Sequence, residues 1–192
     1  NIANEIQAFF ELPPERVTSG KRLAEIMGGK AQRIRLNVAA YLASKEERNE
    51  ELEKIYTMMK GLLVHDLTEE KFADMYAQTL VYGLFVARYG DESPEDFSRK
   101  EARDLVPASN PFLREFFDHI VGPRFDARLG YIVDELCEVF KVSDVKEIVH
   151  KHLKVTDDAQ DEKDPIIHFY EDFLKEYDPI ERKKMGAYYT PI

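Results

Sequence analysis

Large apolar side chains recur at three- and four-residue spacing along most of the chain, which is the period of an α-helix. From Phe72 through Tyr76 and Tyr82 to Val86 they mark one long helix, and residues 129–140 repeat the pattern. No segment shows a convincing period of two, and no Asn-Gly or Asp-Gly hairpin turn occurs. The sequence therefore predicts an all-α fold, an irregular multi-helix bundle of about eight to ten helices with no substantial sheet.

Capping residues mark where these helices begin. The Ser-x-x-Glu box of residues 44–47 predicts a helix that runs to about Leu63, because the Ser hydroxyl and the Glu carboxylate can each satisfy a free backbone N–H. Residues 98–101 repeat this box. Other predicted N-caps precede a glutamate or a proline: Thr68, Asn110, Asp164 and Asp178.

Glycine and polar residues predict the breaks between helices. The adjacent Gly28 and Gly29 are expected to weaken or kink the helix that contains them, since glycine is a poor helix former. The longest polar run, KVTDDAQDEK at residues 154–163, predicts a flexible acidic connector. Its carboxylates are expected to be solvated rather than to bind a metal.

The net charge of −10 is unevenly distributed. Residues 1–60 carry 10 Lys and Arg against 9 Asp and Glu, whereas residues 61–192 carry 17 against 28. An acidic surface repels phosphate, so most of the chain is not expected to lie along DNA. The exception is a basic stretch that could contact phosphates or form a solvated helix face: Arg16, Lys21, Arg22, Lys30, Arg33 and Arg35.

The residue types that most often carry chemistry are sparse. Cys137, the single cysteine, lies in an apolar helical run, which favours a small buried side chain over a nucleophile. One cysteine also excludes an internal disulfide framework and fits a reducing compartment. His150 and His152 would point to different faces of a helix, so no metal site is predicted. No apolar run is long enough to span a membrane, and a cytoplasmic location is expected.

The C-terminal residues carry the most specific motif. The segment DPIIHFYEDFL at residues 164–174 leads to GAYYTP at residues 186–191. Gly-x-Tyr-Tyr-Thr-Pro is similar to motif X of N6-adenine DNA methyltransferases. Residues 66–192 resemble the helical region and the opening of the methyltransferase domain in fused restriction–modification enzymes, of the type IIG and type I-like single-polypeptide kind. Residues 1–65 resemble the less distinctive approach from an upstream nuclease domain.

The resemblance implies that motif X helps to hold S-adenosylmethionine. Glycine allows a tight exit from the helix, threonine offers polar groups, and the aromatic and proline surfaces form an apolar wall. The implied contacts are Tyr189, Thr190 and Pro191, supported by Gly186 and Tyr188. The alternative is a turn whose tyrosines pack on the bundle. The Phe-x-Gly-x-Gly loop and a complete Asn-Pro-Pro-Tyr motif do not occur in this chain, so no catalytic residue is expected in it.

These expectations divide the chain into four parts. Residues 1–65 are expected to be a helical connector from an upstream domain, residues 66–153 the bundle core, residues 154–163 a flexible acidic linker, and residues 164–192 a helix and turn leading into a truncated methyltransferase domain. The expected function is a coupler in a longer enzyme that cleaves DNA and methylates adenine N6. Its partners would be the flanking nuclease and methyltransferase domains, with DNA bound through the longer enzyme. S-adenosylmethionine would be bound by that enzyme and not by this fragment. The alternative is a DNA-backbone-binding or protein-interaction helical module without its own catalysis.

Overall fold

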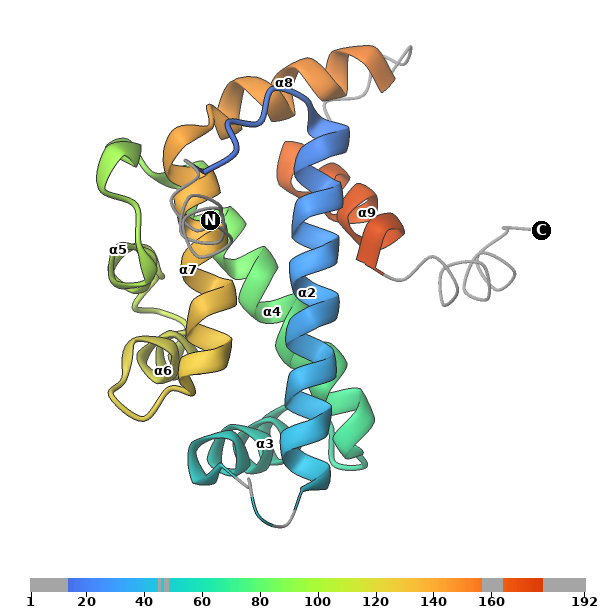
Figure 1. The fold of residues 1–192 in the computed structure, drawn as a ribbon, viewed down its shortest axis with the longest axis vertical. Helices are drawn as coiled ribbons and strands as arrows, with labels where there is room; N and C mark the ends of the chain where they lie inside the picture. Colours follow the sequence, from blue (N-terminus) through green and yellow to red (C-terminus); the bar gives the residue numbers. More distant parts are fainter. Residues whose placement is uncertain (1–13, 45, 47–48, 157–163, 178–192) are drawn as a thin grey trace, which may run out of the picture.

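The structure, a computed structural model, describes residues 14–44, 46, 49–156 and 164–177. This part of the chain contains eight α-helices, one short 3-10 helix and no strand (Figure 1), which confirms the predicted all-α fold. The elements are α2 (Gly20–Ala43), α3 (Glu50–Leu62), α4 (Glu69–Gly90), η1 (Pro94–Asp96), α5 (Arg99–Leu105), α6 (Pro111–Val121), α7 (Ala127–Val142), α8 (Val145–Thr156) and α9 (Pro165–Tyr177).

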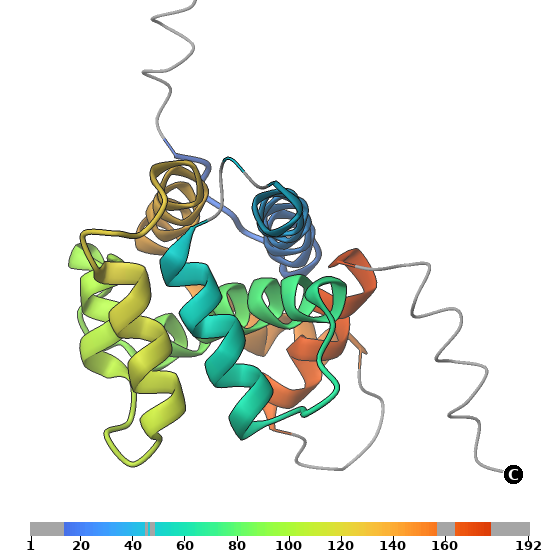
Figure 2. The ribbon, with the colours of Figure 1, turned by 90° about the horizontal axis from the view of Figure 1, so that it is seen from below.

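The two longest helices, α2 and α4, pack on each other and organise the bundle. Figures 1 and 2 show α9 beside α2, with α7 and the α5–α6 pair on the opposite side of the molecule from α9. Helix α5 packs on both α4 and α7. Helix α2 packs mainly on α4 and α9, and also contacts α7 and α8. One continuous hydrophobic core extends from Val17 to Tyr177, so the helices at both ends of the described chain share it.

Several helices begin where the sequence predicts. The hydroxyl of Thr68 accepts a hydrogen bond from the N–H of Lys71, and that of Ser98 accepts one from Glu101. The side chain of Asn110 accepts a bond from the N–H of Leu113. Further along the chain, the Asp164 carboxylate accepts a bond from the N–H of Ile166, and α9 begins at Pro165. Asp178 lies outside the described residues.

The predicted helix start at Ser44 is wrong. Helix α2 continues to Ala43, and Ser44 closes its C-terminus by donating its N–H to the carbonyl of Ala40. Helix α3 begins at Glu50, because the side chain of Asn49 accepts the N–H groups of the first turn. The box is a local pattern, and burial of the last turns of α2 in the core outweighs it.

The Gly28–Gly29 pair does not end the helix that contains it, since α2 runs through both positions. Gly28 is buried under the C-terminus of α9: a Cβ atom there would lie 2.7 Å from the carbonyl carbon of Glu176. Gly29 is exposed and a Cβ there would meet no atom within 4 Å. The first glycine thus allows two helices to approach closely.

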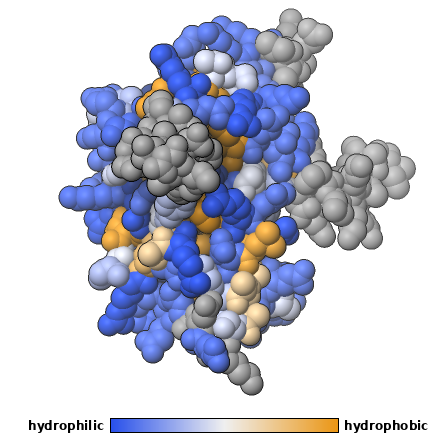
Figure 3. All heavy atoms as spheres, in the orientation of Figure 1, coloured by the Kyte–Doolittle hydropathy of each residue, from blue (hydrophilic) through white to orange (hydrophobic). Residues whose placement is uncertain are grey.

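The interior is rich in aromatic side chains. Phe85 of α4 stacks on Phe169 of α9 with ring centroids 4.9 Å apart, and Phe173 stacks on Tyr177 at 5.8 Å. Cys137 is buried, and burial raises the pKa of its thiol to about 12, which agrees with the predicted structural role. The face in Figure 3 is mostly hydrophilic, with small separate hydrophobic areas. None of the described helices combines the length and apolar composition needed to cross a membrane.

Candidate functional site

The predicted cofactor contacts, Gly186 and residues 188–191, lie outside the described residues. The helix that leads toward them, α9, is described as far as Tyr177, and contacts with α2 and α4 hold this residue. Its hydroxyl donates to Oδ1 of Asp74 at 2.6 Å, and its carbonyl accepts from Nε2 of Gln32 at 2.6 Å. The guanidinium of Arg35 lies 5.5 Å from the ring centroid. Tyr177 is also 1% exposed, so it is enclosed by the helices that it contacts. Helices α2 and α4 thereby fix the position of the last residue of α9.

Polar contacts continue along both sides of α9. The hydroxyl of Tyr170 donates to Oε1 of Gln78 at 2.7 Å, and that of Tyr82 donates to the carbonyl of Ile166. On the other side, Nε2 of His152 lies 2.9 Å from Oδ2 of Asp172. Burial alone would raise the pKa of the Asp172 carboxyl, but hydrogen bonds from His152 and a neighbouring lysine lower it. These contacts join α9 to α4 on one side and to α8 on the other.

A cleft of about 620 Å³ opens where α9, α4 and the α5–α6 connection meet. No charged side chain lines it, and its polar groups come from Gln78, Thr79, Tyr82 and Tyr170. The remaining lining residues are Met75, Gly83, Val86, Ala87, Gly90, Leu105, Val106, Pro107, Leu113 and Phe117. Such a cleft suits an uncharged, mainly apolar group. The sequence pattern predicted the helix of residues 72–88 only as a central core helix. Its apolar residues occur on more than one face, which was the sign that a further face could line a cleft.

The structure separates the six residues of the predicted basic stretch. Arg22 bonds to Glu15 at 2.9 Å and also pairs with Glu25 at 3.4 Å. Lys30 and Arg33 both pair with Glu135 of α7. Two of these three acids, Glu15 and Glu135, lie outside the basic stretch. Their proximity reduces the positive field along α2, because an acid within bonding distance offsets the charge.

The other members of the basic stretch have different surroundings. Arg35 lies over the ring of Tyr177, and Lys21 is exposed. Arg16 lines a small pocket with Asp91 and Lys146. Acidic or aromatic partners thus lie against four of the six residues, Arg22, Lys30, Arg33 and Arg35.

His119 is the most deeply buried of the histidines for which an exposure is given. Its Nε2 lies 2.7 Å from the hydroxyl of Tyr76, and its Nδ1 is buried without a hydrogen-bond partner among the described residues. Burial lowers the pKa of the His119 imidazole to about 4, so the ring is neutral near pH 7. Within the described part of the chain no acidic or cysteine side chain bonds to the ring, so this geometry fits a core histidine.

Three carboxylates meet between α4 and α5, and the sequence pattern did not predict their proximity. They belong to Asp91, Asp96 and Glu101, one from each of three successive elements or caps. The sequence contained one sign of this, the five-residue spacing of acids across a helix–turn–helix segment, but only the turn geometry makes them converge.

The comparisons with known proteins gave no match: no family model, curated protein or solved structure is significantly similar to this chain.

Proposed function

We propose that this chain is a helical coupler in a restriction–modification enzyme that cleaves DNA and methylates adenine N6 with S-adenosylmethionine. The bundle would hold the segment resembling motif X in a defined place next to the flanking domains. The chain itself would supply no catalytic residue, and at most one wall of the cofactor pocket.

One structural observation carries the proposal beyond the motif itself: Tyr177 is buried and bonded to both α2 and α4 shortly before the segment that contains the motif. Bonds to Asp74 and Gln32 fix the end of α9 on two different helices. Eight residues separate Tyr177 from Gly186, and an extended chain of that length spans at most about 28 Å. A rigid start and a short tether would keep the motif close to the bundle, which is what a coupler requires.

The coding sequence and the full gene product provide the test. We expect the downstream sequence to contain the Phe-x-Gly-x-Gly loop and the Asn-Pro-Pro-Tyr motif. The full gene product should transfer a tritiated methyl group from S-adenosylmethionine to adenine N6 in DNA, with the target base flipped out of the duplex. The 192-residue chain should transfer none.

Two variants of the full gene product address the motif. Tyr189→Ala and Thr190→Ala should raise the Kd for S-adenosylmethionine about ten-fold or more, because each removes a wall or a polar contact. Tyr131→Ala, at an exposed position of α7, is the matched control and should leave the Kd unchanged. A reading frame that ends near Ile192, or methyl transfer by the 192-residue chain alone, would contradict the proposal.

The apolar cleft favours a second function, a protein-interaction module without catalysis. Its occupant would be an uncharged apolar cluster from a flanking domain of the same polypeptide, since the lining carries no charge. Val86→Glu should then loosen the contact and speed proteolysis between the domains. Val121→Glu is the control, because its side chain is equally exposed, at 37% against 39%, but does not line the cleft. Domain contact without methyl transfer would support this function over the first.

A further inference from the structure

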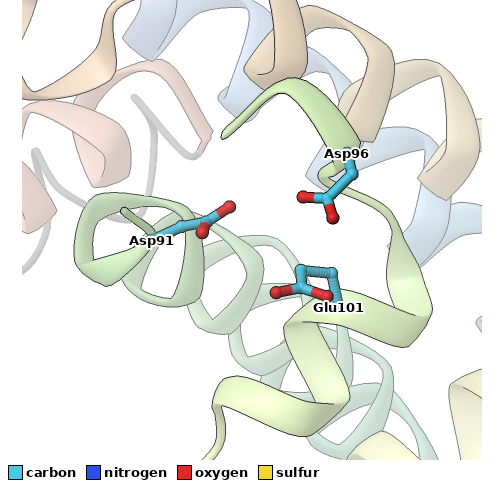
Figure 4. A group of neighbouring side chains, drawn as sticks. All are labelled: Asp91, Asp96 and Glu101. Atoms are coloured by element: carbon cyan, nitrogen blue, oxygen red, sulfur yellow. The ribbon is translucent and has the colours of Figure 1, made fainter. Parts of the chain in front are cut away.

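Three carboxylates converge where α4 ends and α5 begins. Asp91 caps the C-terminus of α4, Asp96 ends the η1 turn, and Glu101 lies in the first turn of α5. One oxygen atom from each carboxylate lies within 4.8 Å of the other two. Figure 4 shows the three side chains pointing toward a common space. We call this group the α4–α5 carboxylate cluster.

Asp91 gives an independent indication that the cluster has a ligand. Its side chain is 4% exposed, and Oδ1 accepts the N–H and the hydroxyl of Ser93 at 2.9 and 3.3 Å. Its Oδ2 is buried and has no hydrogen-bond partner within the described structure. A buried carboxylate oxygen without a donor costs free energy, and such groups are normally paired or bind a metal. The carboxylate of Asp91 faces the other two (Figure 4).

The cations near the cluster form no ion pair with it in the described part of the chain. Arg16, Lys141 and Lys146 line a pocket together with Asp91, but none of them lies within ion-pair distance of its carboxylate. Arg88 attracts Asp91 electrostatically, but its guanidinium donates to the carbonyls of Phe140 and Ser143. Among the described residues, no ion pair to Asp96 or Glu101 is present. Burial, and next the repulsion from Asp96 and Asp91, raise the pKa of Glu101. The attraction of Lys100 lowers this pKa by a smaller amount. The cluster therefore carries a negative charge that a bound cation would relieve.

We propose that the α4–α5 carboxylate cluster binds a Ca²⁺ ion. Carboxylate oxygens are the ligands of hard divalent cations, and Ca²⁺ accepts them at about 2.4 Å in flexible geometry. Ca²⁺ tolerates an irregular arrangement of such ligands, whereas Mg²⁺ requires a near-ideal octahedron at about 2.1 Å. The bound ion joins the end of α4 to the start of α5 and contacts Oδ2 of Asp91. Water and backbone carbonyls complete the coordination.

Calorimetric titration of the 192-residue chain with CaCl₂ tests the proposal. We expect one site with a Kd on the order of 10⁻⁴–10⁻³ M, weaker binding of MgCl₂, and a rise in melting temperature with Ca²⁺. Asp96→Asn and Glu101→Gln should each weaken Ca²⁺ binding about ten-fold or more, because each removes a charged ligand. Glu95→Gln is the matched control: its residue is exposed, belongs to the same turn and lies outside the cluster.

Three further results separate this site from other acidic groups. In NMR spectra, Ca²⁺ should shift the amide resonances of residues 91–101 first. With EDTA present, Glu101→Gln should be at least as stable as the wild-type chain, because the substitution relieves repulsion; this shows that the variant folds. The proposal is overturned if the wild-type chain shows no Ca²⁺-dependent heat or melting shift, if both ligand variants bind like Glu95→Gln, or if the first shifts map to Asp157, Asp158 and Asp161.

Discussion

Gly28 shows how one residue can determine the distance between two helices. It is buried in α2, and the backbone of Glu176 in α9 occupies the space that a side chain would need. The neighbouring Gly29 has open space around it. The two adjacent glycines are equivalent in the sequence, but they have opposite expected responses to substitution.

We therefore predict that Gly28→Ala destabilises the chain by about 1–3 kcal/mol, because the new methyl group must displace the α9 backbone. Gly29→Ala should stabilise it by about 0.5–1 kcal/mol, since alanine is the better helix former. Urea unfolding of the two variants and the wild-type chain measures both changes. Equal effects of the two substitutions would show that α9 does not approach α2 at Gly28.

His119 makes the stability depend on pH. Burial lowers the pKa of its imidazole from 6.5 to about 4 in the folded chain, while the unfolded chain keeps the ordinary value. Between these two pH values the unfolded state binds more protons than the folded state. The stabilisation is therefore fully present above pH 6.5 and is lost as the pH falls toward 4.

We predict that the free energy of unfolding falls by about 2 kcal/mol between about pH 7 and pH 5, where most carboxyl groups remain ionised. His119→Gln should remove most of this change, whereas His65→Gln, at an exposed position, should keep it. Urea titrations at the two pH values measure the difference. If His119→Gln keeps the same pH dependence, the His119 ring takes up a proton in the folded chain as readily as in the unfolded chain, and the prediction is wrong.

At the scale of the elements, α9 depends on long-range contacts. Its two inward-facing phenylalanines, Phe169 and Phe173, are buried, and its hydrogen bonds to α2 and α4 reach residues that are 84 to 145 positions away in the sequence. A helix of 13 residues is marginal in isolation, so packing on α2 and α4 provides most of its stability. The hydroxyl of Tyr177 contributes at its C-terminal end.

We predict that Tyr177→Phe costs about 1–3 kcal/mol, because it removes a buried donor to the Asp74 carboxylate while keeping the aromatic packing. Amide hydrogen exchange should become faster in the last turns of α9 before it changes elsewhere. The control is Tyr131→Phe. Tyr131 is 54% exposed, and removal of its hydroxyl group should cost less than about 0.5 kcal/mol. Uniform acceleration across all helices would contradict a local role for this bond.

The helix ends show which elements a local pattern can predict. Thr68, Ser98 and Asn110 cap helices as predicted, since a cap depends only on the three residues that follow it. Ser44 has the same local chemistry, yet it ends a helix. There the preceding residues of α2 are held in the core, and that contact lies outside any local window.

At the scale of the whole molecule, the net charge and the ion pairs act together. The chain carries −10, and Glu15, Glu25 and Glu135 pair with Arg22, Lys30 and Arg33. Binding to DNA phosphates would require Lys and Arg side chains that are free to neutralise them, which releases the counterions condensed on the DNA. The pairs reduce the number of cations available for this.

We predict that the 192-residue chain binds duplex DNA more weakly than about 10⁻⁴ M at physiological salt, the weak end of non-specific binding. Fluorescence anisotropy with a labelled duplex measures the affinity. Substitution of Arg33 and Arg35 by glutamate should then change little. Tighter, salt-dependent binding that this double substitution abolishes would instead support the DNA-backbone role.

The sequence by itself determined the fold class, four of the eight helix starts in the described residues and the buried state of Cys137. These properties follow from the helical period, from caps that act over one turn and from hydrophobicity, all of which are local. The motif at residues 186–191 is also read from the sequence alone, whereas the function proposed from it draws in addition on the contacts of Tyr177.

Only the tertiary structure decided which residues meet. It gave Gly28 its role, paired the basic residues of α2 with Glu135, opened the charge-free cleft beside α4 and brought Asp91, Asp96 and Glu101 together. The carboxylates converge through the turn between α4 and α5, whereas the first three depend on the angle and spacing at which helices pack. Side chains from distant positions set that geometry jointly, so no single stretch of the sequence contains it.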